Sequence, residues 1–222
     1  MAHNEFVHLH LHSQYSLLDG AIRFGEVFDL AKKYRMDTVA LTDHGNMFGA
    51  IEFYQMAIKH GIKPIVGCEV YVAPGSRFEK KTAAEGGEGA FHLTLLVKNR
   101  TGYFNLIKLI SLAYLEGFYY KPRVDKELLS KYHEGLICLS GCLKGEIAAL
   151  AGRGEMKKGL QAAEEYRRIF DDRRFFIELM KNGVENQALV NERLLEIGRE
   201  LFLPVVATND CHYLNREDAR AQ

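Results

Sequence analysis

The stretch FVHLHLH (residues 6–12) places His8, His10 and His12 at every second position of a short apolar run. Successive side chains of an extended strand point to opposite faces, so the three histidines should occupy one face and the intervening leucines the other. Imidazoles at positions i and i+2 lie about 7 Å apart along a strand, which allows two of them to converge on one ion. The stretch therefore predicts an N-terminal strand with a metal-binding face.

Six further apolar runs follow this stretch and alternate with segments of helical period. The seven predicted strands cover residues 6–12, 38–43, 64–73, 91–98, 136–140, 174–180 and 204–209. Helical spacing of apolar residues covers 24–34, 49–60, 102–116, 156–170 and 184–202. This alternation is typical of βα units around a parallel sheet, and seven strands favour an α/β fold of the (β/α)7 barrel type. The polar, glycine-rich segment 74–90 has no periodicity and predicts a mobile surface loop.

The composition of the chain limits the classes of protein to which it can belong. A chain of 222 residues with 47% hydrophobic content can form one domain with a sizeable core. Lys plus Arg and Asp plus Glu both number 29, so no global positive field favours nucleic-acid binding, and any such contact must be local. The first residues lack the uninterrupted apolar stretch of a signal peptide, and no apolar run reaches the roughly 18 residues needed to span a bilayer. We therefore expect a cytoplasmic protein that makes no membrane contact, and the four cysteines predict no disulfide framework.

Acidic and imidazole side chains recur where predicted strands end. Asp43 and His44 close the second run, and Asp210 and His212 follow the seventh. The loops after the strands form the active face of a (β/α) barrel, so these residues are candidates for function. Glu69 lies inside the apolar run 64–73, where an unpaired buried carboxylate costs several kcal/mol and requires a metal or a cation.

Five further residues are weaker candidates, and they are Asp19, His92, Cys142, Lys121 and Arg123. Asp19 follows the first run, His92 opens the fourth run, and Cys142 follows the fifth run. The position of the histidine is unexplained, because it begins its run whereas the other candidates lie within or after theirs. The two basic residues could contact phosphate, although such charges usually lie on a solvated surface. No serine-hydrolase elbow, phosphate-binding P-loop or dinucleotide fingerprint is present, which argues against nucleotide-cofactor chemistry.

The motifs HLHLHS, TDHGN, FHLTLL, LSGC and NDCH occur in this order, and with them the chain closely resembles the PHP (polymerase and histidinol phosphatase) family. Within that family it is most similar to the N-terminal domains of bacterial replicative DNA polymerases, and the resemblance runs through essentially the whole sequence. It implies a distorted, TIM-like barrel of seven strands. We accordingly expect residues 1–222 to form a single PHP domain that is the N-terminal part of a longer polymerase chain.

The resemblance also implies a site for up to three divalent metals, with zinc, manganese or iron as candidates. It assigns a first ligand set of His10, His12, Glu69 and Asp210, a second of Glu69, His92 and Cys142, and a third of Asp19, His44 and His212. Of these, Glu69, Asp210 and His12 would be central to catalysis. Asp43 and His8 would have supporting roles, with Asp43 orienting a ligating histidine.

Such a metal cluster supports hydrolysis of phosphodiesters. The favoured function is a 3′-5′ exonuclease that proofreads for an attached polymerase, with a DNA 3′ end, the rest of the polymerase chain and other replisome or proofreading subunits as partners. One alternative is a non-catalytic scaffold that metals stabilise. Another is a free-standing phosphatase of small metabolites such as histidinol phosphate. DNA synthesis by this segment alone is not expected, because the catalytic aspartates of such polymerases lie downstream of the domain.

Overall fold

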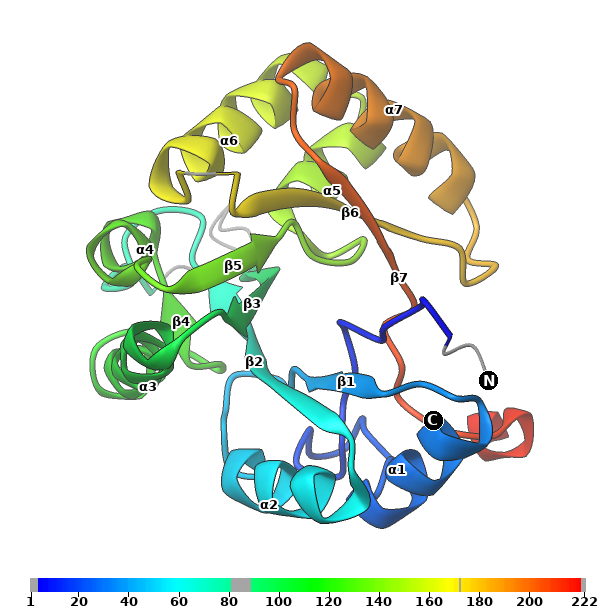
Figure 1. The fold of residues 1–222 in the computed structure, drawn as a ribbon. Coiled ribbons are helices and arrows are strands. Elements are labelled where there is room, and N and C mark those ends of the chain that lie inside the picture. Colours follow the sequence, from blue (N-terminus) through cyan, green and yellow to red (C-terminus); the bar gives the residue numbers. More distant parts are fainter. Residues whose placement is uncertain (1–3, 81–88, 172, 221–222) are drawn as a thin grey trace.

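The strands form a curved seven-stranded sheet in a computed structural model that describes residues 4–80, 89–171 and 173–220 (Figure 1). The strands are β1 (Thr38–Leu41), β2 (Lys63–Val72), β3 (Phe91–Val97), β4 (Arg123–Val124), β5 (Leu136–Leu139), β6 (Phe175–Met180) and β7 (Val205–Thr208). They pair in the order β1-β2-β3-β5-β6-β7, and β4 pairs with β2 outside this path. The sheet curls into the distorted barrel that the sequence predicted.

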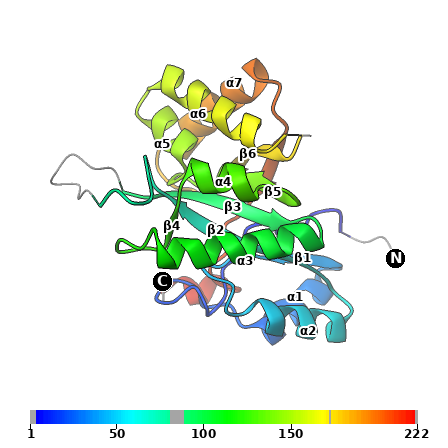
Figure 2. The ribbon, with the colours of Figure 1, turned by 90° about the vertical axis from the view of Figure 1, so that its left-hand side faces the viewer.

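Helices cover the outer side of the curved sheet. They are α1 (Phe24–Lys33), α2 (Ala50–His60), α3 (Arg100–Leu115), α4 (Lys126–Tyr132), α5 (Glu146–Gly152), α6 (Met156–Ile169) and α7 (Gln187–Glu200), followed by the 3-10 helix η2 (Arg216–Arg220). In Figure 1, α1 and α2 lie beside β1 and β2, while α5, α6 and α7 lie beside β6. Figure 2 is viewed from the side on which α3 and α4 lie. The five predicted helices are confirmed, and the short α4 and α5 were not predicted.

The segment 8–13 is not the regular strand that the sequence predicted. It makes isolated bridges, with His8 beside Val39 of β1 and Leu11 beside Cys211 after β7. Its backbone bonds run to both sides, since Thr42 N donates to Leu11 O at 2.9 Å and His12 N donates to Cys211 O at 2.8 Å. The segment therefore joins the first and last strands of the sheet and closes the barrel without forming a continuous ladder. We call residues 8–13 the closing segment.

The sheet is not parallel throughout. Strand β3 runs antiparallel to both β2 and β5, whereas the pairs β1–β2, β2–β4, β5–β6 and β6–β7 are parallel. The first residues of β3 consequently lie at the same edge as the last residues of β2, and His92 is opposite Tyr71. This reversal explains why a candidate ligand begins its strand while the others lie near strand ends.

Two hydrophobic clusters hold the helices on the sheet. The larger one includes Leu106 and Leu109 of α3 and Phe175 and Ile177 of β6, all of them fully buried. Burying each such side chain contributes about 1.5–3 kcal/mol. The smaller cluster lies under α1 and α2. Of the predicted loop 74–90, residues 81–88 lie outside the described part of the chain. Among the described helices, none is both long and apolar enough to span a membrane.

Candidate metal centre

All nine candidate ligands lie together at the edge of the barrel where the parallel strands end. Seven different parts of the chain contribute them: His10 and His12 from the closing segment, Asp19 from the loop after it, His44 after β1, Glu69 in β2, His92 in β3, Cys142 after β5, and Asp210 and His212 after β7. Contacts between side chains link every one of them to at least one other member.

Glu69 is at the centre of this cluster and is almost fully buried. Its Oε1 lies 2.9 Å from His92 Nδ1 and 3.3 Å from His10 Nε2, and its Oε2 contacts His44. Cys142 Sγ lies 3.9 Å from Oε1 on the same side as His92. Burial alone would raise the pKa of this carboxyl, but the contacts from the three histidines outweigh burial and hold the pKa well below its usual range. Glu69 therefore stays ionised and touches members of all three ligand sets.

Asp210 completes the first ligand set. Its Oδ1 lies 3.1 Å from His12 Nε2, 3.3 Å from His10 Nε2 and 3.6 Å from His212 Nδ1. The residue has a φ of 50°, a left-handed conformation that Asp and Asn adopt more readily than other side chains that have a Cβ. Although burial raises the pKa of its carboxyl, His10 and His12 lower it to about 2.

Asp19 marks the open side of the cluster. Its Oδ2 lies 2.8 Å from His44 Nε2 and 3.4 Å from His212 Nε2, and its side chain is 42% exposed. The imidazoles of His12 and His212 stack at a centroid distance of 4.3 Å. The third ligand set is thus the one that solvent reaches most easily.

Five buried polar atoms of the cluster lack a hydrogen-bond partner among the described residues. They are His10 Nε2, His12 Nε2, His44 Nδ1, Glu69 Oε2 and Asp210 Oδ1. A buried polar atom without a partner costs about 1–3 kcal/mol, so five in one place are not expected of a site built for structure alone. The donors also form three compact groups, namely His10, His12 and Glu69; His44, Glu69 and His92; and His12, His44 and His212. Within each group the donor atoms all lie within 4.8 Å of one another, and this donor chemistry suits divalent cations.

Glu178 in β6 is a site residue that the sequence analysis missed. Its Oε1 lies 2.8 Å from His10 Nδ1 and accepts from Thr208 Oγ1 at 2.6 Å, while its Oε2 accepts from Gly141 N at 3.0 Å. The carboxylate therefore fixes the orientation of His10 and leaves Nε2 facing the cluster. The signal was present in the sequence, because Glu178 interrupts an apolar run just as Glu69 does.

Asp43 supports the site through serines. Its Oδ1 accepts from Ser13 N and from Ser16 Oγ, both at 2.7 Å, and Ser16 Oγ lies 3.0 Å from His12 Nδ1. The expected contact between Asp43 and a histidine side chain is therefore indirect, with Ser16 between the two residues.

His8 does not share a face with His10 and His12, so the predicted alternation is wrong here. Its Nδ1 lies 3.4 Å from Cys211 Sγ, and it lines an apolar pocket together with Leu11 on the α1 side of the barrel. The closing segment bends at residue 10 instead of continuing as a pleated strand, which breaks the two-residue period. His8 is consequently separated from the candidate ligands.

The two predicted phosphate contacts differ. Arg123 is buried, with its Nε donating to Gly117 O at 3.0 Å and its Nη2 donating to Arg77 O and Glu79 O at 2.9 Å. Its guanidinium connects the loops that contain these carbonyl groups, and the prediction that it contacts phosphate is not supported. Lys121 Nζ, in contrast, lies 5.3 Å from the centroid of the Tyr71 ring, which is beside His92.

The chain is similar in sequence to known proteins over its whole length. The chain is 50% identical over 219 residues to a DNA polymerase III subunit alpha from Borreliella burgdorferi and 48% identical over 222 residues to one from Treponema pallidum. These alignments cover 99% and 100% of this chain but only 19% of either relative, so the chain spans about a fifth of their length.

The fold also occurs in solved structures. A crystal structure from Bifidobacterium adolescentis, described as a metal-dependent phosphoesterase, matches with a TM-score of 0.62 at 12% identity and covers 93% of this chain and 87% of that one. At this identity the match shows the fold alone. The family model of the PHP domain matches residues 8–182, which include seven of the nine candidate ligands. The chain therefore belongs to the PHP domain family.

Proposed function

We propose that this PHP domain is a metal-dependent phosphodiesterase that removes nucleotides from the 3′ end of DNA for a polymerase. The observation that carries the proposal is the cluster of five buried polar atoms that face one another without forming a hydrogen bond, and that converge from three histidines and two carboxylates. The similarity to DNA polymerase III alpha subunits supports a substrate at a DNA end. The fold that it shares with a protein described as a metal-dependent phosphoesterase supports hydrolysis.

The three ligand sets would each hold one divalent cation. Imidazole and thiolate donors favour zinc, whereas the carboxylates Glu69, Asp210 and Asp19 also admit manganese or iron. When bound, such ions activate water for attack and neutralise charge on the phosphoryl oxygens. Glu69 would belong to two sets and link them, since its Oε1 contacts both His10 and His92.

The surrounding residues hold these donors in place. Glu178 fixes His10 and Ser16 contacts His12, in each case at Nδ1, so both Nε2 atoms face the cluster. Asp19 leaves one side open to solvent, and a substrate phosphate would enter there. A frayed or single-stranded end reaches a largely buried cluster more easily than paired duplex does, which favours a mismatched 3′ terminus as substrate.

The activity of the whole protein belongs to the same proposal. We infer that residues 1–222 act as one domain of a replicative DNA polymerase, with the rest of that chain and other replisome subunits as partners. The similarity over the full chain to alpha subunits about five times longer supports this inference.

The test compares the wild-type protein with Asp210→Asn on a labelled primer that ends in a mismatch. Asparagine tolerates the left-handed backbone at this position and keeps the shape of the side chain, but it removes the charge. We expect cleavage by the manganese- or zinc-loaded wild-type protein and none by the variant, and both metal-free proteins should have the same circular dichroism spectrum and unfold cooperatively. Equal cleavage by both proteins would indicate a contaminating nuclease and remove support for the proposal.

A second candidate function is a scaffold that metals stabilise. It is favoured by a stripe of exposed hydrophobic side chains along and after α3, comprising Phe104, Ile107, Tyr114, Leu115 and Phe118. Such a stripe is common where another protein surface packs. Metal-loaded wild-type protein that cleaves no DNA, alone or joined to its polymerase, would favour this role.

A further inference from the structure

A tight hairpin turn stands next to the metal centre, between α3 and β4. It consists of residues 118–121, and we call it the aromatic hairpin. Tyr119 and Lys121 form an antiparallel bridge with Tyr120 at the tip. The hairpin is adjacent to the site because Pro122 packs over Gly45, where an added Cβ would come within 2.9 Å of Pro122 and 3.1 Å of Tyr71.

Lys121 lies next to the Tyr71 ring, which in turn lies beside two of the candidate ligands. Its Nζ lies 5.3 Å from the centroid of the Tyr71 ring, and that ring lies 5.2 Å from the His92 ring and 6.1 Å from the His44 ring. Lys121 forms no ion pair with any residue in the described parts of the chain. An exposed lysine next to a candidate metal centre, with no carboxylate partner among the described residues, is well placed to bind an anionic group of the substrate.

Tyr120 presents an aromatic ring to solvent. Its side chain is 78% exposed, and its backbone has a φ of 57°, a conformation that is costly for a bulky residue. Strain of this kind persists only where the surrounding structure imposes it, and it is frequent at ligand-binding positions. Next to the tip, the Arg123 guanidinium donates to Gly117 O and lies 5.3 Å from the Tyr119 ring centroid, so residues that flank the tip are anchored. The tip therefore offers an exposed aromatic ring on an anchored turn.

We propose that the aromatic hairpin binds single-stranded DNA on its way to the metal centre, with Tyr120 stacked on an unpaired base and Lys121 paired with a backbone phosphate. Proteins that bind single strands without sequence preference combine aromatic stacking surfaces with basic groups along the backbone. The inference rests on the proposed function for its choice of DNA. Its test is a binding measurement, so it can fail or succeed independently of hydrolysis.

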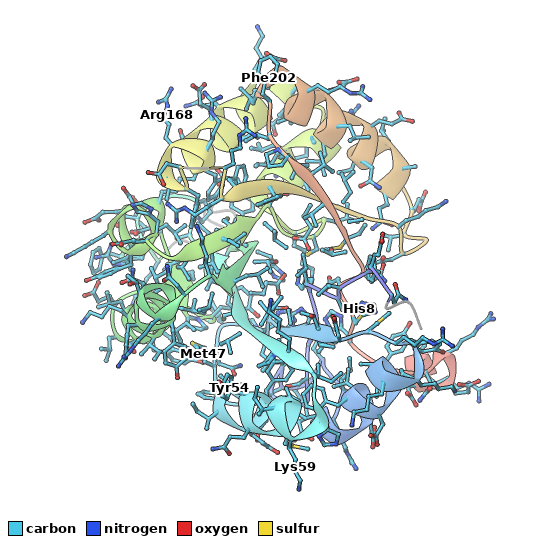
Figure 3. The ribbon with its side chains drawn as sticks, in the orientation of Figure 1. His8, Met47, Tyr54, Lys59, Arg168 and Phe202 are labelled. Atoms are coloured by element: carbon cyan, nitrogen blue, oxygen red, sulfur yellow. The ribbon has the colours of Figure 1, made fainter. Side chains whose placement is uncertain are left out.

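The experiment measures the fluorescence anisotropy of a labelled single-stranded oligonucleotide against the metal-free protein. The variants are Tyr120→Asn and Lys121→Gln, because asparagine tolerates the positive φ and glutamine removes the charge but keeps a polar, unbranched side chain. The matched controls are Phe202→Asn, which removes a 92% exposed aromatic ring at a φ of 53°, and Lys59→Gln at the end of α2. In Figure 3 these two control residues lie at opposite outer edges of the molecule.

Removing one stacked base contact should raise the Kd about fivefold or more. We expect a loss of this size for Tyr120→Asn, a lower salt dependence for Lys121→Gln by about 0.7 in the slope of log Kobs against log salt, and no change for either control. An oligonucleotide with abasic sites should bind the wild type and Tyr120→Asn equally. One with uncharged methylphosphonate linkages should likewise abolish the difference between the wild type and Lys121→Gln.

The remaining measurements distinguish the possible ligands from one another, and they distinguish the hairpin proposal from the proposed nuclease activity. Blunt duplex DNA should bind more weakly than single strands do. Inorganic phosphate should displace the labelled oligonucleotide from the wild type only at concentrations that also displace it from Tyr120→Asn. Wild-type affinity for single strands in both hairpin variants would overturn the inference, even if the protein hydrolyses DNA. Variants that lose binding in a protein that hydrolyses nothing would instead retain the inference and reject the proposed nuclease.

Discussion

Two buried glutamates with similar sequence context have different tasks at the residue scale. Glu69 and Glu178 both lie in apolar strands and are both almost fully inaccessible to solvent. The Glu178 carboxylate accepts hydrogen bonds from Thr208 and Gly141 and contacts the His10 imidazole, so it serves to position His10. Glu69 is surrounded by imidazoles and keeps an oxygen without a hydrogen-bond partner, so it is available to a cation.

Glu178→Gln should weaken metal binding although Glu178 is not itself a candidate ligand. The amide still fills the space, but it cannot accept at both ends from Thr208, Gly141 and His10, so His10 loses its fixed orientation. Replacing a partner that orients a ligand typically costs about 10–100-fold in metal affinity. Competition with a chromogenic chelator measures this loss, with Glu155→Gln, which lies just before α6 and pairs with Arg153 and Lys158, as control. Wild-type affinity in Glu178→Gln would contradict the positioning role.

Cys142→Ser should discriminate between metals and should alter the pH dependence of zinc binding. Burial and the nearby Glu69 raise the pKa of the Cys142 thiol to about 12 in the metal-free protein, so a thiolate forms only when a metal displaces the proton. Zinc affinity of the wild type should rise more steeply with pH than that of the variant, by about one proton, or tenfold per pH unit. Manganese affinity should change little, since manganese prefers oxygen donors. Parallel pH slopes for the two proteins would exclude a thiolate ligand.

At the scale of elements, the sequence predicted the long helices and most strands because their apolar periods are strong. It failed where tertiary contacts override local pattern. The segment 8–13 has the alternation of a strand, but it must bond to both β1 and the chain after β7, which bends it and turns His8 outward. The direction of β3 also leaves no local signal, because an apolar run reads the same whichever way its neighbours run. The position of His92 was the single visible trace of that reversal.

The turn after β5 offers a test of how elements shape the site. Gly141 has a φ of 85°, and an added Cβ would lie 2.4 Å from His92 O, so Gly141→Ala must displace the start of β3 or the loop. Gly61 is the matched control, since its φ is 70° but an added Cβ would meet nothing within 4 Å. We expect Gly61→Ala to cost about 1 kcal/mol and Gly141→Ala clearly more, within about 1–3 kcal/mol beyond the control. Urea denaturation of metal-free protein measures both, and equal losses would show that the turn adapts freely.

At the scale of the whole molecule, the candidate ligands connect parts of the chain that are far apart in sequence. The first ligand set joins the closing segment, through His10 and His12, to Asp210 at the other end of the described chain. The same two stretches share the backbone bonds that close the barrel. A cation in this set would therefore reinforce the seam where the sheet lacks a continuous ladder, and the stability of the fold would depend on its occupancy.

Chelation should accordingly lower the melting temperature of metal-loaded protein. A ligand that binds only the folded state adds about 2.7 kcal/mol at a hundredfold excess over Kd, which for a chain of this size corresponds to about 5–10 °C. Differential scanning calorimetry before and after exhaustive chelation measures the shift, and Asp210→Asn should show a much smaller one because its first set is impaired. Hydrogen exchange locates the effect: amides of the closing segment, such as His12 N bonded to Cys211 O, should lose protection before those in the centre of β2. An unchanged melting curve for protein shown by elemental analysis to have lost its metal would mean that the barrel closes without help from the ions.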